Sequence, residues 1–394
     1  MSPPPTFPEE KGARWRPPVS SPACAKPHSQ HEEINHLEEL IMKTYRVAVV
    51  GLGRMGSTID ISIANACDAS DRLELVAGAD TLPERRDAFK KTWGVDAIYD
   101  DYEEMISRES PDIVAVCTTA TGLPKPGRKA PSRDYREDSH AEVTTTAAKA
   151  GVPMLYVEKA IACSARAADE ILKACLENGT RINTGVLMRF DDRFTTVRDL
   201  IARGDIGEPT HAVAYTRSNT LMHMHIHSMD MLSYLLGDPG VTAVRGELLP
   251  RDLEIKDNRL DEDPNSTYQI RFANGVEAWA VPAGPRDFEI VGTEGSVRSM
   301  DQGLGAMLRG PESRDSSEPR RTKTLTPDTP SKMTTVVCLE DLLDAHESGR
   351  KTRGDVTVAH NLTEACLAVT ESHRLGGAWV DLPMENRDLY VFHV

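Results

Sequence analysis

The sequence lacks paired cysteines and long apolar runs. Its seven cysteines stand singly, with no CxxC pair, so neither a disulfide framework nor a thiolate zinc site is indicated. No segment approaches the ~20 apolar residues that cross a bilayer. Basic residues are also in short supply, with 46 against 61 acidic ones and a net charge of −15. This balance argues against nucleic acid or an anionic membrane as the main partner. We therefore expect a cytoplasmic protein that binds a small molecule.

The first 43 residues differ in composition from the rest of the chain. They are rich in proline and have no apolar periodicity, which predicts a disordered extension. They also lack the apolar segment of a secretory signal. Translation that starts at Met42 is an alternative, which mass spectrometry of the native N-terminus would test. For the remaining length we predict two domains, residues 44–188 and 189–394.

The first predicted domain alternates strands with helices. Apolar strand patterns begin at Tyr45 and recur over Leu73–Asp80, Asp112–Thr119, Pro153–Lys159 and Thr180–Phe190; helical patterns fall between them at Met55–Ala66, Pro83–Trp93, His140–Ala150 and Ala165–Glu177. Strands that are apolar at nearly every position are typical of a sheet covered on both faces. The pattern predicts a doubly wound parallel sheet of the Rossmann type.

The second predicted domain has a different texture. A helix at Asp192–Ala202 is followed by strand-like runs with alternating apolar residues, and Asn274–Gly275 is a strong hairpin signal. Helices are expected near Met229–Leu236 and His360–Arg374, and residues 303–333 are polar enough to predict a surface loop. We expect an α/β domain with an open, mostly antiparallel sheet, whose exposed face favours a homodimer or homotetramer.

A glycine motif carries the strongest local signal. Gly51, Gly53 and Gly56 form G-x-G-x-x-G between a strand and a helix, with Arg54 and Met55 inside the motif. Such glycines allow a tight turn, close approach of the backbone to a pyrophosphate, and close packing of helix on strand. The predicted cofactor site therefore includes all five residues.

An acidic residue follows the motif at the end of the next strand. Asp80 can accept hydrogen bonds from the ribose diol of adenosine and would repel a 2′-phosphate, which favours NAD over NADP. Arg85 and Arg86 come soon after it and keep NADP open as the less favoured cofactor.

At this point the sequence resembles a known family. The segments GLGRMG, VCTTA, SHAEV, YVEKA, VLMRF, GDIGEP, HSMD and GTEGSVR occur in the order found in the Gfo/Idh/MocA oxidoreductases, from about Tyr45 to about Pro383. The resemblance implies a Rossmann domain followed by an α/β domain. It also implies NAD(P)-dependent oxidation or reduction of a sugar, polyol or cyclitol.

The resemblance also implies roles for single residues. Lys159 matches a lysine between cofactor and substrate, and His227 matches the histidine that takes or gives the hydroxyl proton. Thr118, Thr119 and His140 match the region beside the nicotinamide ribose. Glu158 matches the glutamate of the family's Glu-Lys-Pro signature and is included in the predicted cofactor site. This pairing suits the chemistry, because a histidine can accept the proton near neutral pH and a lysine can stabilise a developing alkoxide.

This sequence departs from the family pattern at three places. Ala160 stands where the signature has proline, and His223 stands where many members have aspartate. The link Gly122–Ser139 is long and basic, so it is either a cover over the substrate pocket or a surface loop. We expect His223 to orient substrate or to relay protons.

The histidine-rich segment also allows other interpretations. On a helix that reaches back to His223, His223, His227 and Asp230 share one face, whereas His225 points elsewhere. If the segment before Ser228 is extended instead, all three histidines share a face, and either geometry could bind a divalent metal. The resemblance favours proton transfer at His227 without a metal. We expect Asp230 to support His227 or its helix, or to bind substrate, and His225 to be packed or exposed.

Two further residues could line the substrate cleft. Arg189 and Asp192 follow the last strand of the first domain, where the domains meet, so each either binds substrate or holds the junction together. The rival functions are an NAD-dependent glycosidase or lyase, a non-catalytic dinucleotide-binding regulator, and a metal-dependent hydrolase.

Overall fold

The computed structural model describes residues 43–118, 138–216, 220–310, 321–327, 330 and 332–393. Thr44–Val394 form one compact unit. The predicted extension 1–43 therefore lies almost wholly outside the described residues, as do Thr119 and nearly all of the basic link 122–139. No helix in the ranges that are described is both long and apolar enough to cross a membrane.

The first sheet is parallel, as predicted. Within the described ranges it has six strands in the order β3-β2-β1-β4-β5-β6. These strands are β1 (Tyr45–Val50), β2 (Leu73–Ala79), β3 (Ala97–Tyr99), β4 (Ile113–Val116), β5 (Met154–Val157) and β6 (Arg181–Thr184). Every residue of β4 and β5 is buried, which explains their unbroken apolar sequence. Helices α3 (Pro83–Trp93), α4 (Tyr102–Glu109), α5 (Ser139–Lys149) and α6 (Ala165–Asn178) connect the strands.

Two predicted elements of this half are wrong in extent. The predicted helix Met55–Ala66 is a π-helical turn, η1 (Arg54–Thr58), and a separate short helix, α2 (Ile63–Asp68). Ser62 interrupts them because its hydroxyl caps α2 by accepting from the Asn65 N–H. The predicted strand Thr180–Phe190 ends after β6, and its second half is a 3₁₀ turn, η2 (Leu187–Phe190).

The second sheet is mixed and mostly antiparallel, as predicted. Among the described residues it has nine strands in the order β15-β14-β13-β12-β7-β11-β10-β8-β16. They are β7 (Pro209–Tyr215), β8 (Val241–Leu249), β10 (Asn265–Phe272), β11 (Glu277–Val281), β12 (Asp287–Gly292), β13 (Ser296–Met300), β14 (Gly305–Gly310), β15 (Arg321–Leu325) and β16 (Val380–Asp381). The hairpin predicted at Asn274–Gly275 is confirmed, since β10 and β11 pair around it. The surface loop predicted for 303–333 is wrong in part, because β14 and β15 lie there.

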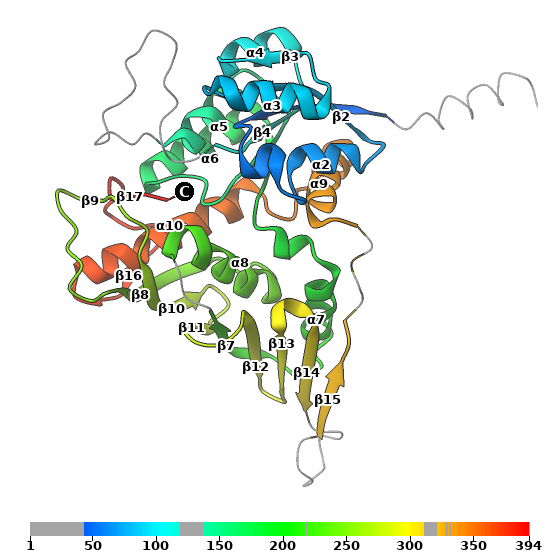
Figure 1. The fold of residues 1–394 in the computed structure, drawn as a ribbon. Coiled ribbons are helices and arrows are strands. Elements are labelled where there is room, and N and C mark those ends of the chain that lie inside the picture. The colour runs from blue at the N-terminus through cyan, green and yellow to red at the C-terminus, as the bar shows by residue number, and fades with distance from the viewer. Residues whose placement is uncertain are drawn as a thin grey trace, which may run out of the picture. The chain divides into compact units, whose positions relative to one another are not determined.

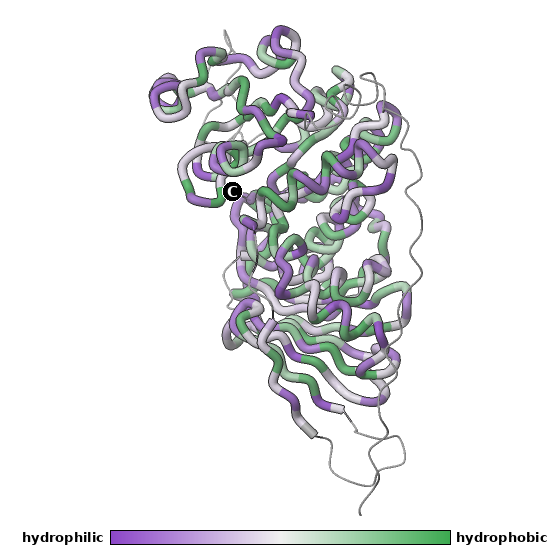
Figure 2. The backbone as a smooth tube through the Cα atoms, turned by 90° about the vertical axis from the view of Figure 1, so that its right-hand side faces the viewer, coloured by the Kyte–Doolittle hydropathy of each residue, from purple (hydrophilic) through white to green (hydrophobic). Residues whose placement is uncertain are grey.

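Helices cover one face of this second sheet. They are α7 (Asp192–Ala202), α8 (Ile226–Leu235) and α10 (Val356–Arg374), and α10 packs on both β8 and α6, so it lies between the two sheets (Figure 1). Hydrophobic and hydrophilic residues alternate along the strands of this sheet (Figure 2). In β11, for example, Ala278 and Ala280 are buried, whereas Val281 is exposed. The opposite face of the sheet carries no helix of the described chain.

One later helix returns to the first sheet. Helix α9 (Thr334–Ser348) contacts β5, β6 and α2, and its Val336 and Leu339 share a hydrophobic cluster with Tyr45 of β1. Because α9 follows residue 189 in the chain but packs on the first sheet, the two sheets do not divide the chain at one point. The predicted domain boundary between residues 188 and 189 stays a prediction. A third, two-stranded sheet pairs β9 (Arg259–Leu260) with β17 (Tyr390–Val391), close to the C-terminus.

Candidate active site

The candidate site lies at the carboxyl edge of the parallel sheet. Strands β1 and β4 are neighbours, but the chain runs from β1 outward to β2 and β3 before it returns to β4. Ligands of doubly wound sheets bind where the strand order reverses in this way. Gly51 follows β1, Thr118 follows β4, and Glu158 with Lys159 follow β5, so the topology brings three predicted groups to one edge.

The glycine turn has the shape that a dinucleotide needs. Gly51 has φ +92°, and a Cβ there would lie 2.5 Å from the Cys117 carbonyl oxygen. A Cβ on Gly56 would collide with the Gly51 carbonyl oxygen. A Cβ on Gly53 would meet only the Arg85 guanidinium, at 3.4 Å, so this glycine leaves its backbone accessible. These three positions fit a bound pyrophosphate, with Arg54 and Met55 in the turn that follows.

Asp80 is tied to the same turn. One carboxylate oxygen accepts from the Leu52 N–H at 2.9 Å, and the other accepts from the Leu82 N–H at 2.9 Å. Arg85 Nη1 lies 3.5 Å from the carboxylate, and Arg86 donates to the Asp80 carbonyl. Each carboxylate oxygen retains acceptor capacity. Asp80 is therefore placed at the end of β2 where the ribose of a bound NAD would reach.

His140 connects the ends of β4 and β5. Its ring nitrogens lie 2.9 Å from the carbonyl oxygens of Thr118 and Ala160, and the Thr118 hydroxyl is buried without a hydrogen-bond partner. His393 also reaches the Ala160 oxygen, at 3.0 Å from Nε2, while its Nδ1 lies 3.4 Å from Cys163 Sγ. Burial, chiefly, lowers the pKa of His393 to about 3 and raises that of Cys163 well above its usual range. The neutral ring therefore donates from Nε2 and accepts the thiol hydrogen at Nδ1.

Lys159 and Glu158 form a largely buried ion pair. Lys159 Nζ lies 3.2 Å from Glu158 Oε2, and the lysine side chain is 12% exposed. Tyr156 donates to the other carboxylate oxygen at 2.5 Å. Burial alone would raise the pKa of Glu158, but Lys159 and the Tyr156 hydrogen bond lower it below its usual range. Glu158 is thus ionised, and it holds a lysine next to the predicted nicotinamide position.

The histidine-rich segment is helical but irregular. It forms a π-helical turn, η3 (Leu221–His225), that continues into α8. The Asp263 carboxylate caps this turn, since it accepts from the N–H groups of Met222 at 2.7 Å and His223 at 2.9 Å. Burial raises the pKa of Asp263 to about 6, against the effect of these bonds. Asp263, which the sequence did not single out, therefore positions the segment that carries His223 and His227.

His227 is buried near the charge of Lys159, the lysine predicted to be catalytic. Burial lowers the pKa of His227 well below its usual range, and the charges of Lys159, Arg286 and His223 add to this effect. Its Nδ1 is buried without a hydrogen-bond partner. The ring is therefore neutral and is available to accept a proton. Lys159 and His223, the other predicted catalytic residues, thus act electrostatically on the protonation of His227.

His225 is packed, and the segment does not form a metal cluster. Its ring nitrogens lie 3.3 Å from the Tyr268 hydroxyl and 3.2 Å from Asn265 Oδ1, and burial lowers its pKa to about 4. In the part of the chain that the structure describes, no three histidine, cysteine or acidic side chains are placed to hold a metal ion.

Arg189 and Asp230 require a correction. The Arg189 side chain is 0% exposed, and its N–H groups bond Asp230, Asp238 and the Arg353 carbonyl. This uses every donor of the guanidinium, so Arg189 does not bind substrate. Asp230 pairs with Arg189 instead of His227. Burial raises the pKa of Asp230 to about 6, and its Oδ2 has no partner. Asp230 and Lys159 do line one cavity of about 10 Å³, which has room for a single water at most.

Asp192 is the remaining residue that was predicted to bind substrate. Asp192 begins α7, and no hydrogen bond or ion pair within the described ranges connects it with Lys159 or His227. The sequence reasoning missed Asp263, Arg286 and His393, although each is a polar residue next to a predicted strand or at the chain end.

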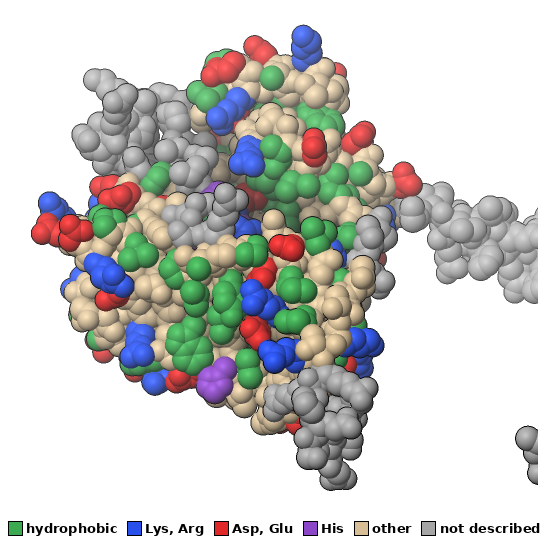
Figure 3. Space-filling model, turned by 60° about the horizontal axis from the view of Figure 1, so that its bottom comes forward, with side chains coloured by type: hydrophobic (Ala, Val, Ile, Leu, Met, Phe, Trp, Pro, Cys, Tyr) green, Lys and Arg blue, Asp and Glu red, His purple; other side chains and the backbone are tan. Residues whose placement is uncertain are grey.

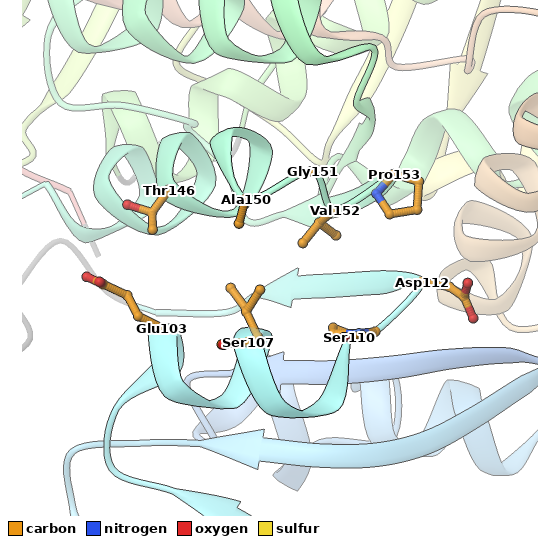
Figure 4. Close-up of a pocket in the computed structure, with 11 residues that line it drawn as sticks. Glu103, Ser107, Ser110, Asp112, Thr146, Ala150, Gly151, Val152 and Pro153 are labelled. Carbon is orange, nitrogen blue, oxygen red and sulfur yellow. The ribbon is translucent and has the colours of Figure 1, made fainter.

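A larger pocket of about 550 Å³ lies between α4 and α5 at the amino ends of β4 and β5, lined by Glu103, Asp112 and Thr146 among others (Figure 4). It opens at the wrong edge of the sheet to serve the cofactor.

Comparison with known proteins finds one family that matches both halves of the chain. Residues 45–186 match the model of an oxidoreductase family with an NAD-binding Rossmann fold, and residues 212–382 match the C-terminal alpha/beta domain of the same family. The chain is 26% identical to scyllo-inositol 2-dehydrogenase (NAD(+)) of Bacillus subtilis over 274 residues, which cover 64% of this chain and 72% of that protein. It is 27% identical to D-glucoside 3-dehydrogenase of Escherichia coli over 261 residues, which cover 59% and 68%.

A solved structure shares the fold. Levoglucosan dehydrogenase in complex with NADH and levoglucosan superposes with a TM-score of 0.69 at 18% identity, over 87% of this chain and 100% of that one. The glycine turn, the acidic residue after β2 and the matches to both domain models lead to one conclusion. The chain belongs to the Gfo/Idh/MocA oxidoreductase family and has its NAD-binding Rossmann domain.

Proposed function

We propose that this protein transfers a hydride between NAD and a carbinol or keto carbon of a sugar, polyol or cyclitol. The observation that carries the proposal is the Lys159–Glu158 ion pair after β5, at the carboxyl edge of the NAD-binding sheet, with the charge of Lys159 acting on His227. Two relatives are named for inositol and glucoside oxidation, which supports the same substrate class.

The residues divide the reaction between them. NAD⁺, when bound, accepts the hydride that leaves the carbinol carbon. His227 takes the hydroxyl proton, because its ring is neutral and its pKa is low enough for it to lose that proton again. Lys159 stabilises the negative charge that develops on the oxygen. His223 orients the substrate, and Glu158 with His140 hold the lysine and the Thr118 backbone in place.

A screen of substrates tests this function. We expect the protein with NAD to produce NADH from at least one class among neutral aldoses, inositols, sugar alcohols and sugar acids. The readout is NADH absorbance, with the Lys159→Ala variant beside the wild type. Tight NAD binding with no NADH from any substrate would instead favour a glycosidase that regenerates its NAD, or a non-catalytic binder.

We also propose that the second sheet pairs two copies of the chain. On its open face, Trp279 lies opposite Val213 and Val281 lies opposite Tyr215, so apolar side chains gather across β7 and β11. Seen from this side, hydrophobic side chains form a patch between charged ones (Figure 3). Such patches mark interaction sites.

The pairing predicts a dimer or a tetramer in solution. Sedimentation of the Trp279→Glu/Val213→Glu variant should show a shift toward monomer, because a buried interface does not tolerate unpaired carboxylates. The control is Leu176→Glu, which changes a 64%-exposed leucine on α6. A wild type that sediments as a monomer would contradict the proposal.

We also propose a cytoplasmic location. The cysteines of the described chain are single, buried and unpaired, which supports it.

A further inference from the structure

An arginine with no ion pair to the described residues contacts the turn that precedes the proposed catalytic histidine. Arg286 belongs to the short loop between β11 and β12, and it is half-buried. Its guanidinium reaches the η3 turn, where Nη2 lies 4.0 Å from Met224 Sδ. A thioether is a weak acceptor. Contact with Met224 therefore does not satisfy the charge of this side chain.

No carboxylate within the described ranges lies at ion-pairing distance from Arg286. The nearest one in sequence, Asp287, is already bound by Arg298 at 2.8 Å and by the Asp301 N–H at 2.8 Å. Burial lowers the pKa of Arg286, and no neighbouring acid opposes this effect. Arg298 differs in this respect, because its pair with Asp287 raises its pKa despite burial. Half-buried arginines usually have such a partner, so the lack of one at Arg286 needs a cause.

The charge of Arg286 acts on the histidine-rich segment. It acts on the pKa of His227 together with Lys159, and it also acts on His225. His225 is satisfied by Tyr268 and Asn265, so it offers Arg286 no acceptor. The positive charge of Lys159, in contrast, is paired with the Glu158 carboxylate. Around His227, Arg286 is therefore a positive charge that no carboxylate of the described ranges balances.

We propose that the substrate supplies the negative charge that pairs with Arg286. Arg286 binds a carboxylate of the sugar, and the preferred substrate is a sugar acid. A single guanidinium presents two parallel N–H donors, which match the two oxygens of a carboxylate. This inference rests on the proposed function. In the reaction, the carbinol C–H bond breaks and its hydride goes to NAD⁺, the O–H proton goes to His227, and a C=O bond forms. The carboxylate is unchanged, so the products are a keto acid, NADH and a proton.

Matched pairs of substrates test the inference. The NAD-loaded wild type is assayed with galacturonate against galactose and with glucuronate against glucose, and with glucose 6-phosphate as a phosphate arm. We expect kcat/KM to be about 30-fold higher for the acid than for its neutral partner, which is the size of a charge-assisted hydrogen bond of roughly 2 kcal/mol. Arg286→Gln should remove this preference, mainly by raising KM for the acid. Because Arg286 also acts on the pKa of His227, the readout is the ratio of kcat/KM for the acid to kcat/KM for its neutral partner, which should fall to about one. Arg309→Gln, at an exposed position of β14, is the control.

The outcomes separate this inference from the proposed function. Turnover of neutral sugars with no preference for acids, or a preference for the phosphate, overturns the inference while the dehydrogenase stands. If no substrate is turned over, calorimetric titration of the NADH-loaded protein with galacturonate decides. Binding that Arg286→Gln abolishes supports the carboxylate site even though the proposed reaction fails. An absence of binding to the wild type overturns the inference.

Discussion

Replacing Lys159 by alanine should lower kcat for NADH formation by about a thousandfold. Loss of one preorganised group that stabilises a developing oxyanion costs roughly 10²–10³ in kcat. The charge of Lys159 also adds to burial in lowering the pKa of His227. NAD should still bind, because the glycine turn and Asp80 hold it without the lysine. Stopped assays of NADH absorbance give kcat, and fluorescence titration gives the affinity for NAD.

Two variants control this result. Lys173→Ala removes an exposed lysine of α6 and should leave kcat unchanged. Lys159→Arg keeps the charge at a different position and should restore only part of the rate. If Lys159→Ala lowered kcat less than tenfold with NAD binding intact, the assigned role of the lysine would be wrong. If NAD binding were also lost, the variant would report on the cofactor site and not on catalysis.

The sequence predicted the parallel half of the fold well because local pattern and burial agree there. α3 begins and ends at the predicted residues, since Pro83 marks its start, and in the second half α7 does the same after its cap, Asp191. The pattern failed where capping or chain position decides the structure. Ser62 splits the helix after the glycine motif, and β14 with β15 lie at the edge of the sheet, where polar strands are tolerated. Composition alone suggested a loop there.

The site could be predicted only as far as single positions carry chemical meaning. The resemblance pointed to Lys159 and His227 because a motif surrounds each of them. Arg286 could not be found this way. It is notable because no carboxylate of the described ranges pairs with it, and only the folded chain shows which charges are paired. The role of Asp230 was misjudged for a similar reason. Helical spacing places it near His227, but the buried Arg189 lies within 2.6 Å and binds it instead.

The buried cluster around Arg189 gives the second large effect, which is on stability. Arg189→Met should lower the free energy of unfolding by about 3–5 kcal/mol, because it leaves the Asp230 and Asp238 carboxylates without their cation. Burial alone would lower the pKa of Arg189, but Asp230 and Asp238 outweigh it and keep the guanidinium charged. Methionine keeps much of the volume, so the effect comes from charge more than from a cavity. The shift in the urea unfolding midpoint measures it.

The matched variants separate charge from packing. Arg203→Met breaks an exposed pair with Asp205 and should change the free energy of unfolding by less than about 0.5 kcal/mol. Arg189→Met combined with Asp230→Leu removes both partners of the most buried pair and should recover part of the loss, because apolar groups then replace unpaired charges. If Arg189→Met unfolded at the same urea concentration as Arg203→Met, the cluster would not hold the junction together.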